Sequence, residues 1–292
     1  MRFVVCIATA ALWSQLAAAE TLERQADAAP SGEVEIVNVA GDVRVIGWDR
    51  PQVQVKADLD SDVEELEFET RGNHTLIKVK WPQGDAGGGS SSLVVHVPRD
   101  SSVMVKTVSA SQTLENVRGE QRLQSVSGEI ETQVWDEDFQ AKSVSGQIHA
   151  SGHGDRGSAR VTNVSGGVQL DRIAGDVDVS TVNGEIDIRG TQVERVRLKT
   201  TNGGITFAGA LIPEARLEAE AINGAIVANL HGKIDASFDI ETFNGAIDNC
   251  FGPKPQRTSE YAPGKALRFE EGSGSARVRI KTLNGAVELC RK

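Results

Sequence analysis

The sequence has few aromatic residues, little basic charge and no helical patterning. Phe, Trp and Tyr make up 4% of its 292 residues, and no stretch carries an apolar stripe at helical spacing. A core of packed helices is therefore not expected. Acidic residues outnumber basic ones by 41 to 31, which gives a net charge of −10 at pH 7. Without clustered Lys and Arg, the linear sequence offers no patch for nucleic acid, acidic polysaccharide or anionic lipid.

Long hydrophobic runs are missing after the N-terminal stretch MRFVVCIATAALWSQLAAAE. This stretch has one Arg, a short apolar run and then Ala17, Ala18 and Ala19, the layout of a secretory signal peptide over residues 1–19. Its apolar run is shorter than the roughly 20 residues of a spanning helix. We expect cleavage near Ala19, with an uncleaved anchor as the alternative. The mature chain should be exported to the periplasm or cell surface, without a transmembrane segment.

Glycine is abundant, at 30 residues, and much of it belongs to one recurring phrase. The phrase is TVNGEI at 181–186, SVSGEI at 125 and TLNGAV at 282. Its glycines are Gly128, Gly146, Gly166, Gly184, Gly203, Gly224, Gly245 and Gly285, spaced by 18, 20, 18, 19, 21, 21 and 40 residues. A period near 20 residues is the signature of a solenoid.

Within each period, apolar and polar residues alternate, as in GDVDVSTVNGEIDI at 175–188. This alternation predicts strands. We therefore expect an all-β fold, a single parallel β-solenoid (β-helix) of about 18–21 residues per coil, with right-handed winding favoured by the crossover rule. Residues 20–30 are expected to be disordered, 31–105 to form an irregular β-rich cap, and 106–292 to form the regular solenoid with an insertion at about 252–275.

The phrase itself has a structural interpretation. Gly would form a corner of the coil, because it adopts positive φ without a Cβ penalty. The apolar residue of each phrase is expected to point inward, as Val126, Val144, Val164, Val182, Ile222, Phe243 and Leu283. The polar residue before each Gly would join a hydrogen-bonded corner ladder of Ser127, Ser145, Ser165, Asn183, Asn202, Asn223, Asn244 and Asn284.

Two of the three cysteines occupy equivalent positions, since Cys250 and Cys290 each follow their phrase glycine by five residues. If the 40 residues between them held two full coils, their Cα atoms would lie about 9.6 Å apart, too far for a disulfide. If 252–275 is an insertion, the two coils are neighbours at about 4.8 Å and a bridge fits. We expect the Cys250–Cys290 disulfide, which would suit an exported chain.

Catalytic and metal-binding motifs are weak. No Ser lies in a nucleophile elbow. His149, His153 and Asp155 could hold Zn²⁺ or Cu²⁺, but a polar loop is the favoured interpretation. The carboxylates that a glycan-active enzyme might use are more simply solvent-facing: Asp171, Asp176, Asp178, Asp187 and Asp235. An ice-binding face would need a regular Thr column, whereas the column from Ser125 to Thr282 is chemically mixed.

The segments VEIVNVAGDVRVIGWDRP and LVVHVPRD, followed by serial SVSGEI and TVNGEI phrases, resemble the bacterial putative-adhesin family over about residues 31–290. These are exported β-strand-repeat proteins with a domain of unknown function. The resemblance implies a parallel β-solenoid and no catalytic residues. We expect a non-enzymatic exported β-solenoid that acts as an adhesin-like, scaffold or envelope-interaction module. It would bind a protein or glycan of the cell envelope and need no cofactor. The alternative is a carbohydrate-active β-helix enzyme resembling polysaccharide lyases or hydrolases.

Overall fold

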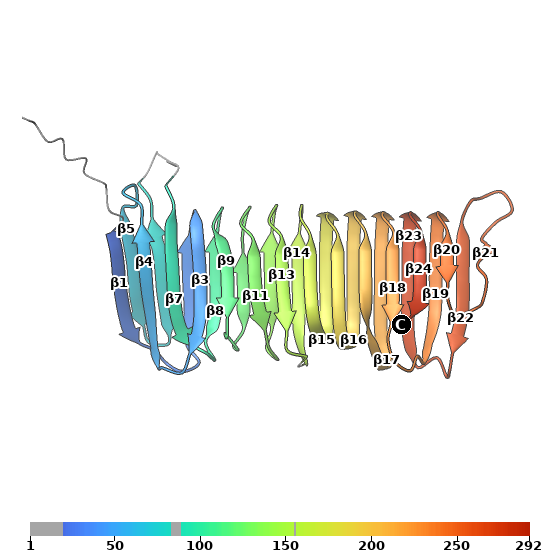
Figure 1. Ribbon diagram of the computed structural model, residues 1–292, viewed down its shortest axis with the longest axis horizontal. Coiled ribbons are helices and arrows are strands. Elements are labelled where there is room, and N and C mark those ends of the chain that lie inside the picture. Colours follow the sequence, from blue (N-terminus) through green and yellow to red (C-terminus); the bar gives the residue numbers. More distant parts are fainter. Residues whose placement is uncertain (1–19, 83–88, 155) are drawn as a thin grey trace, which may run out of the picture.

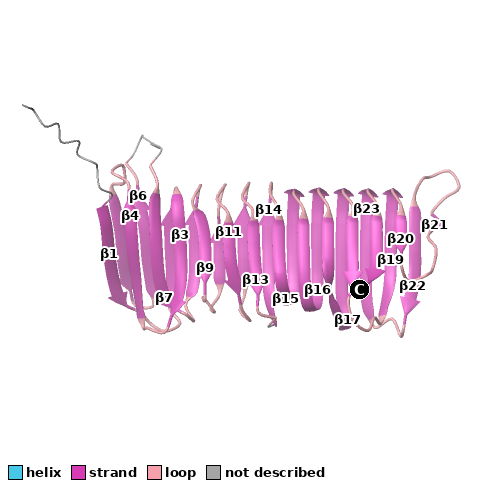
Figure 2. Ribbon diagram, viewed as in Figure 1, coloured by secondary structure: helices cyan, strands magenta, loops and turns pink. Residues whose placement is uncertain are grey.

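A computed structural model describes residues 20–82, 89–154 and 156–292. The expected signal peptide lies outside this range. The described residues form 24 strands, joined by hydrogen bonds into one continuous sheet, and no helix (Figure 2). The all-β prediction is thus confirmed. In the part of the chain that is described, no helix is long and apolar enough to cross a membrane.

The strands stack along one axis in two walls, which we call sheet A and sheet B (Figure 1). Sheet A contains, in spatial order, β5 (Glu65–Arg71), β6 (His74–Lys80), β2 (Glu33–Asn38), β8 (Ser102–Thr107), β10 (Gln121–Gln124), β12 (Phe139–Ser143) and β14 (Arg156–Asn163). Sheet B contains β1 (Glu20–Asp27), β4 (Gln52–Leu59), β7 (Ser91–Pro98), β3 (Gly41–Trp48), β9 (Ser111–Glu115), β11 (Ile130–Val134) and β13 (Ile148–Gly152).

Three long strands then contribute to both walls: β15 (Val168–Asn183), β16 (Ile186–Asn202) and β17 (Ile205–Asn223). Beyond them, sheet A continues with β23 (Ala276–Asn284), β19 (Ala236–Asn244), β22 (Lys265–Glu271) and β21 (Gln256–Arg257). Sheet B continues with β18 (Ile226–Leu230), β24 (Val287–Arg291) and β20 (Ile247–Asn249).

Parallel pairing in register builds the core between the walls. In sheet A, Leu123 of β10 lies opposite Val105 of β8 on one side and Ala141 of β12 on the other. All three side chains are completely buried. Alternate residues along each strand point inward, which is what a sheet with one buried face requires. The stacked coils that the sequence period predicts are therefore present.

Both ends of the stack depart from chain order. At the N-terminal end, β2 and β3 lie between β6/β7 and β8/β9. At the C-terminal end, β23 and β24 lie between β17/β18 and β19/β20. Figure 1 shows both insertions as breaks in the colour sequence, with blue β3 beyond teal β7 and dark red β23 and β24 before the lighter β19 and β20. The last coil along the chain is thus not the last in space.

Surface charge explains where β23 inserts. If β17 paired directly with β19 in the observed frame, Glu218 would face Asp239 and Glu220 would face Glu241, and like charges directly opposite each other are destabilising. Lys281 of β23 instead lies between Glu220 and Glu241, with its Nζ 2.7 Å from Glu241 Oε2. With β23 in this place, basic side chains separate the acidic side chains of β17 from those of β19, and repulsion between the strands is replaced by attraction.

Antiparallel strands close the two ends of the stack. β1 pairs with β4, β5 pairs with β6, and at the other end β22 pairs with β19. Such strands cover edges that could otherwise recruit another chain. The disordered segment expected at 20–30 is therefore wrong over Glu20–Asp27, which forms β1. Pairing with β4 gives its backbone donors and acceptors partners that the sequence alone does not reveal.

Candidate functional site

Each recurring phrase forms the same corner, where the chain passes from sheet A to sheet B. The corners lie above one another because backbone bonds link consecutive copies. Ser127 N donates to Val108 O at 2.8 Å, and Ser145 N donates to Val126 O at 2.8 Å. Each of the four phrase positions therefore forms its own column along the stack.

The apolar column points outward, so the predicted inward column is wrong. These side chains are between 38% and 48% exposed and form what we call the corner column. In spatial order its apolar members are Val39, Val108, Val126, Val144, Val164, Val182, Ile222, Leu283 and Phe243, with the half-buried Thr201 between Val182 and Ile222. Val39 and Val108 belong to phrase copies, NVAG at 38–41 and TVSA at 107–110, that a search for Ser/Asn-Gly does not find.

The residue one position earlier is buried at each of these corners, and it is polar except at Ala221. Ser125 is 7% exposed, and its Oγ accepts a 2.8 Å hydrogen bond from Gly128 N. Thr282 is 6% exposed and donates through Oγ1 to Gly224 O at 3.0 Å. These two hydroxyls pair with backbone groups of the corner, whereas Thr181 Oγ1 has no partner among the described residues. Because this column is buried, it is also not available for the ice-binding contact considered from the sequence.

The polar column outside it contains a continuous amide ladder. Each Nδ2 donates to the Oδ1 of the neighbouring asparagine at 2.8–2.9 Å, in the order Asn183, Asn202, Asn223, Asn284 and Asn244. The serines of the same column behave differently. Ser127 and Ser145 donate through Oγ to the carbonyls of Val108 and Val126, at 3.3 and 3.2 Å, and Ser165 contacts Asn183 through a parallel backbone bridge.

Close backbone packing, rather than positive φ, explains most of the corner glycines. A Cβ added to Gly184 would lie 2.0 Å from Gly166 O, and one added to Gly224 would lie 1.8 Å from Gly203 O. Neither residue has a positive φ in the structure. Of the eight phrase glycines, positive φ angles occur at Gly166 and Gly203. The expectation that these glycines are needed for a positive φ is therefore wrong at most corners. Glycine is needed there because the neighbouring coil leaves no room for a Cβ atom.

At the C-terminal end, members of the corner column line an open groove with a volume of about 530 Å³. Ile222, Leu283 and Phe243 line it together with Thr258 and Gly264, which belong to the segment after β20. Two ion pairs border it on sheet A, Lys199–Glu220 at 3.0 Å and Lys281–Glu241 at 2.7 Å. This end could accept an apolar group flanked by polar ones.

The histidines considered for a metal site have separate partners. His149 Nε2 lies 3.3 Å from Asp171 Oδ2 on the next coil. The His153 ring stacks on Trp135 with a 3.7 Å separation between ring centroids. Asp155 lies outside the described residues. Within residues 20–82, 89–154 and 156–292, no group of three or more His, Cys, Asp or Glu is placed to hold a metal ion.

The carboxylates considered for glycan chemistry are distributed over different parts of the surface. Asp171 and Asp187 face outward from sheet B and both contact Arg189. Asp176 and Asp178 lie on sheet A, where Asp176 binds Arg195. Asp235 accepts hydrogen bonds from Ser275 and Ser273, and these bonds lower the pKa of its carboxyl group. The lowered pKa means that the charged carboxylate is favoured, whereas a general acid must hold its proton.

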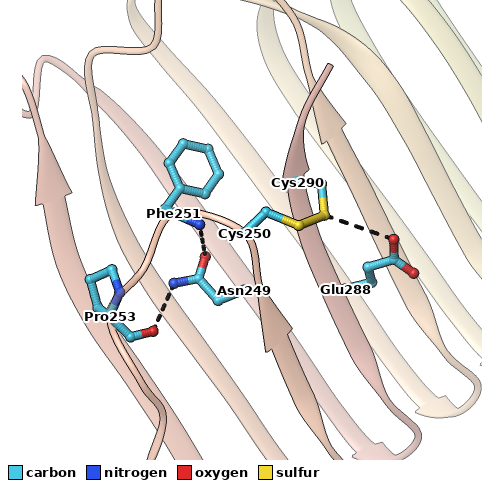
Figure 3. The surroundings of a disulfide bond; sticks show 6 residues. All are labelled: Asn249, Cys250, Phe251, Pro253, Glu288 and Cys290. Atoms are coloured by element: carbon cyan, nitrogen blue, oxygen red, sulfur yellow. Dashed lines mark hydrogen bonds between the residues drawn. A yellow bond between two sulfur atoms is a disulfide. The ribbon is translucent and has the colours of Figure 1, made fainter.

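The Cys250–Cys290 disulfide is present and confirms that the two coils are neighbours (Figure 3). The Cα atoms lie 4.9 Å apart and the bond closes a separation of 40 residues. Cys290 belongs to β24 and Cys250 directly follows β20. Part of the segment between them forms β21 and β22.

Residues 33–289 match the family described as Toastrack DUF4097. The chain belongs to this family. A comparison with curated proteins gives no match. Solved structures that resemble this toastrack chain include a putative adhesin from Parabacteroides distasonis, 13% identical over 92% of this chain and 97% of its own, with a TM-score of 0.39.

Two further structures show a similar level of likeness. A putative adhesin from Parabacteroides merdae is 13% identical, with 92% and 95% of the two chains covered and a TM-score of 0.38. A putative lipid binding protein from Parabacteroides distasonis is 14% identical, with 92% and 96% covered and a TM-score of 0.33. Superpositions this loose carry no functional argument for this chain.

Proposed function

We propose that the protein is a non-enzymatic, exported binding module that docks an extended partner along the corner column. The observation that carries the proposal is the outward row of nine apolar side chains in the described corners, each 38–48% exposed. Single exposed apolar residues are ordinary on protein surfaces, but a row of nine, interrupted only at Thr201 in the described corners and flanked by polar neighbours, is typical of an interaction site. The partner would be a protein or glycan of the cell envelope.

The geometry suits a partner that is itself extended. Successive members of the column are one strand spacing apart, about 4.8 Å, and the asparagine ladder runs beside them. A polymer lying along the stack would meet an apolar side chain at nearly every coil and, over the coils from Asn183 to Asn244, an amide beside it. Export is part of this proposal and draws support from the disulfide, which persists in oxidising compartments. Right-handed winding also belongs to it, on the crossover rule.

The proposal is tested by measuring how the protein captures partners from envelope fractions and how it binds to an array of neutral and acidic glycans. The variant Val144→Ser/Val164→Ser/Val182→Ser removes three adjacent apolar members of the column. Its matched control, Ser111→Ala/Thr113→Ala/Gln133→Ala, changes three polar residues on sheet B. We expect the first variant to lose partner capture and the control to retain it. Equal capture by both variants and the natural chain would show that the corner column is not the binding surface.

A further inference from the structure

A row of three arginines lies on the outer surface of sheet A, at the ends of the strands remote from the corner. Arg195 of β16 pairs in register with Arg216 of β17, and Arg216 pairs in register with Arg277 of β23. Neighbouring strands are about 4.8 Å apart, so the three guanidinium groups project from adjacent positions. We call these residues the arginine row. It forms because β23 inserts next to β17, so no linear stretch of the sequence reveals it.

Two members of the arginine row lack a carboxylate partner. Arg195 binds Asp176 through two nitrogen atoms. Other arginines of the same face, Arg197, Arg268 and Arg279, are also paired with carboxylates. Arg216 and Arg277 join no ion pair among the residues that the structure describes, and both are exposed. They are available to an external anion.

The surface is hollowed on both sides of these two residues. Arg195 and Arg216 line a depression of about 310 Å³ that extends over β14–β17. Arg277 lines a second depression of about 600 Å³ that extends over β19 and β22. The arginine row therefore spans the boundary between two shallow basins in which a ligand could contact the guanidinium groups.

The chemistry of the row selects an oxyanion. Like charges on directly opposite residues of neighbouring strands destabilise a sheet, and an anion between them would remove that cost. Guanidinium groups present planar pairs of N–H donors that match phosphate oxygens, and they stay charged at all physiological pH values. Phosphate is the class of group that this geometry fits best.

The length of the row limits the size of the anion. On the N-terminal side the same register position is Asp176, and on the other side it is Ser237 followed by Glu270. A long polyanion along the stack would meet carboxylates at both ends. We propose that Arg216 and Arg277, with Arg195 beside them, form a binding site for one compact phosphate group, separate from the corner column.

Binding of inorganic phosphate and of pyrophosphate, followed through the NMR signals of the arginine side chains, tests the site directly. We expect saturable shifts in the natural chain and about tenfold weaker binding in Arg216→Gln/Arg277→Gln, from the loss of charge-assisted hydrogen bonds. The control Arg44→Gln/Arg122→Gln removes two arginines that lie outside both depressions and already have carboxylate partners. It should bind as the natural chain does, and circular dichroism should show that both variants are folded.

Vesicles of phosphatidylglycerol, compared with phosphatidylcholine, distinguish the source of the phosphate. Binding to phosphatidylglycerol that is lost in Arg216→Gln/Arg277→Gln would assign a lipid headgroup. Binding restricted to inorganic phosphate or pyrophosphate would assign a soluble phosphate compound. The site is overturned if no probe binds saturably, or if the double variant binds as tightly as the natural chain. Loss of binding in the control to the same extent would equally overturn it, because general surface charge would then be sufficient.

Discussion

Asn244 donates from Nδ2 to Oδ1 of Asn284 at 2.9 Å, although Asn284 follows it by 40 residues in the chain. Asn284 in turn donates to Asn223 at 2.8 Å. The amide ladder thus records the spatial order of the coils, in which the final coil has entered between two earlier ones. In the folded protein β23 therefore pairs with β17 on one side and with β19 on the other.

Charge reversal at Lys281 tests the electrostatic explanation for this insertion. Lys281→Glu would place three carboxylates in one row with Glu220 and Glu241. We expect it to lower the free energy of unfolding by about 1 kcal/mol, since these groups are partly exposed and screened by water. Urea unfolding measures the change, and Lys281→Glu/Glu241→Lys should recover part of it. No recovery in the double variant would contradict the charge explanation.

The asparagine ladder predicts a position-dependent cost. Asn223→Ala removes two amide bonds, one to Asn202 and one from Asn284, whereas Asn244→Ala removes the single bond at the end of the ladder. We expect Asn223→Ala to lower the free energy of unfolding by about 1 kcal/mol and Asn244→Ala to lower it by about half as much. Urea unfolding of the two variants provides the comparison. Equal effects would indicate that the ladder bonds contribute little beyond the packing of each side chain.

The sequence period and the alternation of residues were sufficient to predict the stacked strands, and the equivalent positions of Cys250 and Cys290 were sufficient to predict their bond. Orientation at the corner was not predictable in the same way. The alternation slips by one residue at the phrase, so Val182 could face either side. At several corners, buried hydroxyls at the preceding position, such as those of Ser125 and Thr282, bond to corner backbone groups that exist only once the coils are stacked.

The order of the coils in space could not be predicted from the period either, because the period is the same for any order of neighbouring coils. A charge pattern does carry the signal. Arg279 and Lys281 alternate on the outer face of β23 just as Glu218 and Glu220 do on β17. Reading such patterns between distant strands, rather than along one strand, would have indicated the insertion. It would also have placed Arg277 next to Arg216.

Removal of the disulfide should destabilise the C-terminal end of the stack. Cys250→Ser/Cys290→Ser opens a loop of 40 residues, and the chain-entropy estimate for a loop of this length is about 4 kcal/mol. We expect a loss of about 2–4 kcal/mol in the free energy of unfolding, measured in urea. Dithiothreitol should reproduce the loss in the natural chain and leave the double variant unchanged. Insensitivity of the natural chain to the reductant would show that the bond does not support this end.

The corner glycines allow a matched pair of substitutions. Gly184→Ala places a Cβ 2.0 Å from Gly166 O, whereas Gly204→Ala places one 3.6 Å from Ala225 O, an ordinary contact distance. We expect the first change to cost at least about 2 kcal/mol, because the backbone of the neighbouring coil would have to shift. The second should be neutral or slightly stabilising. Thermal unfolding separates them, and tolerance of Gly184→Ala would show that the coils can move apart at the corner.

The outward direction of the corner column predicts that its members contribute little to folding. Val182 is 43% exposed, whereas Ile186, four residues later, is 1% exposed. We expect Val182→Ser to change the free energy of unfolding by less than about 0.5 kcal/mol. Ile186→Ala should cost about 2–5 kcal/mol through the cavity that it leaves. Urea unfolding decides between the two orientations, because an inward Val182 would make both substitutions costly. A stable Val182→Ser variant would also show that this exposed apolar side chain is not needed for stability, which is compatible with a role in docking.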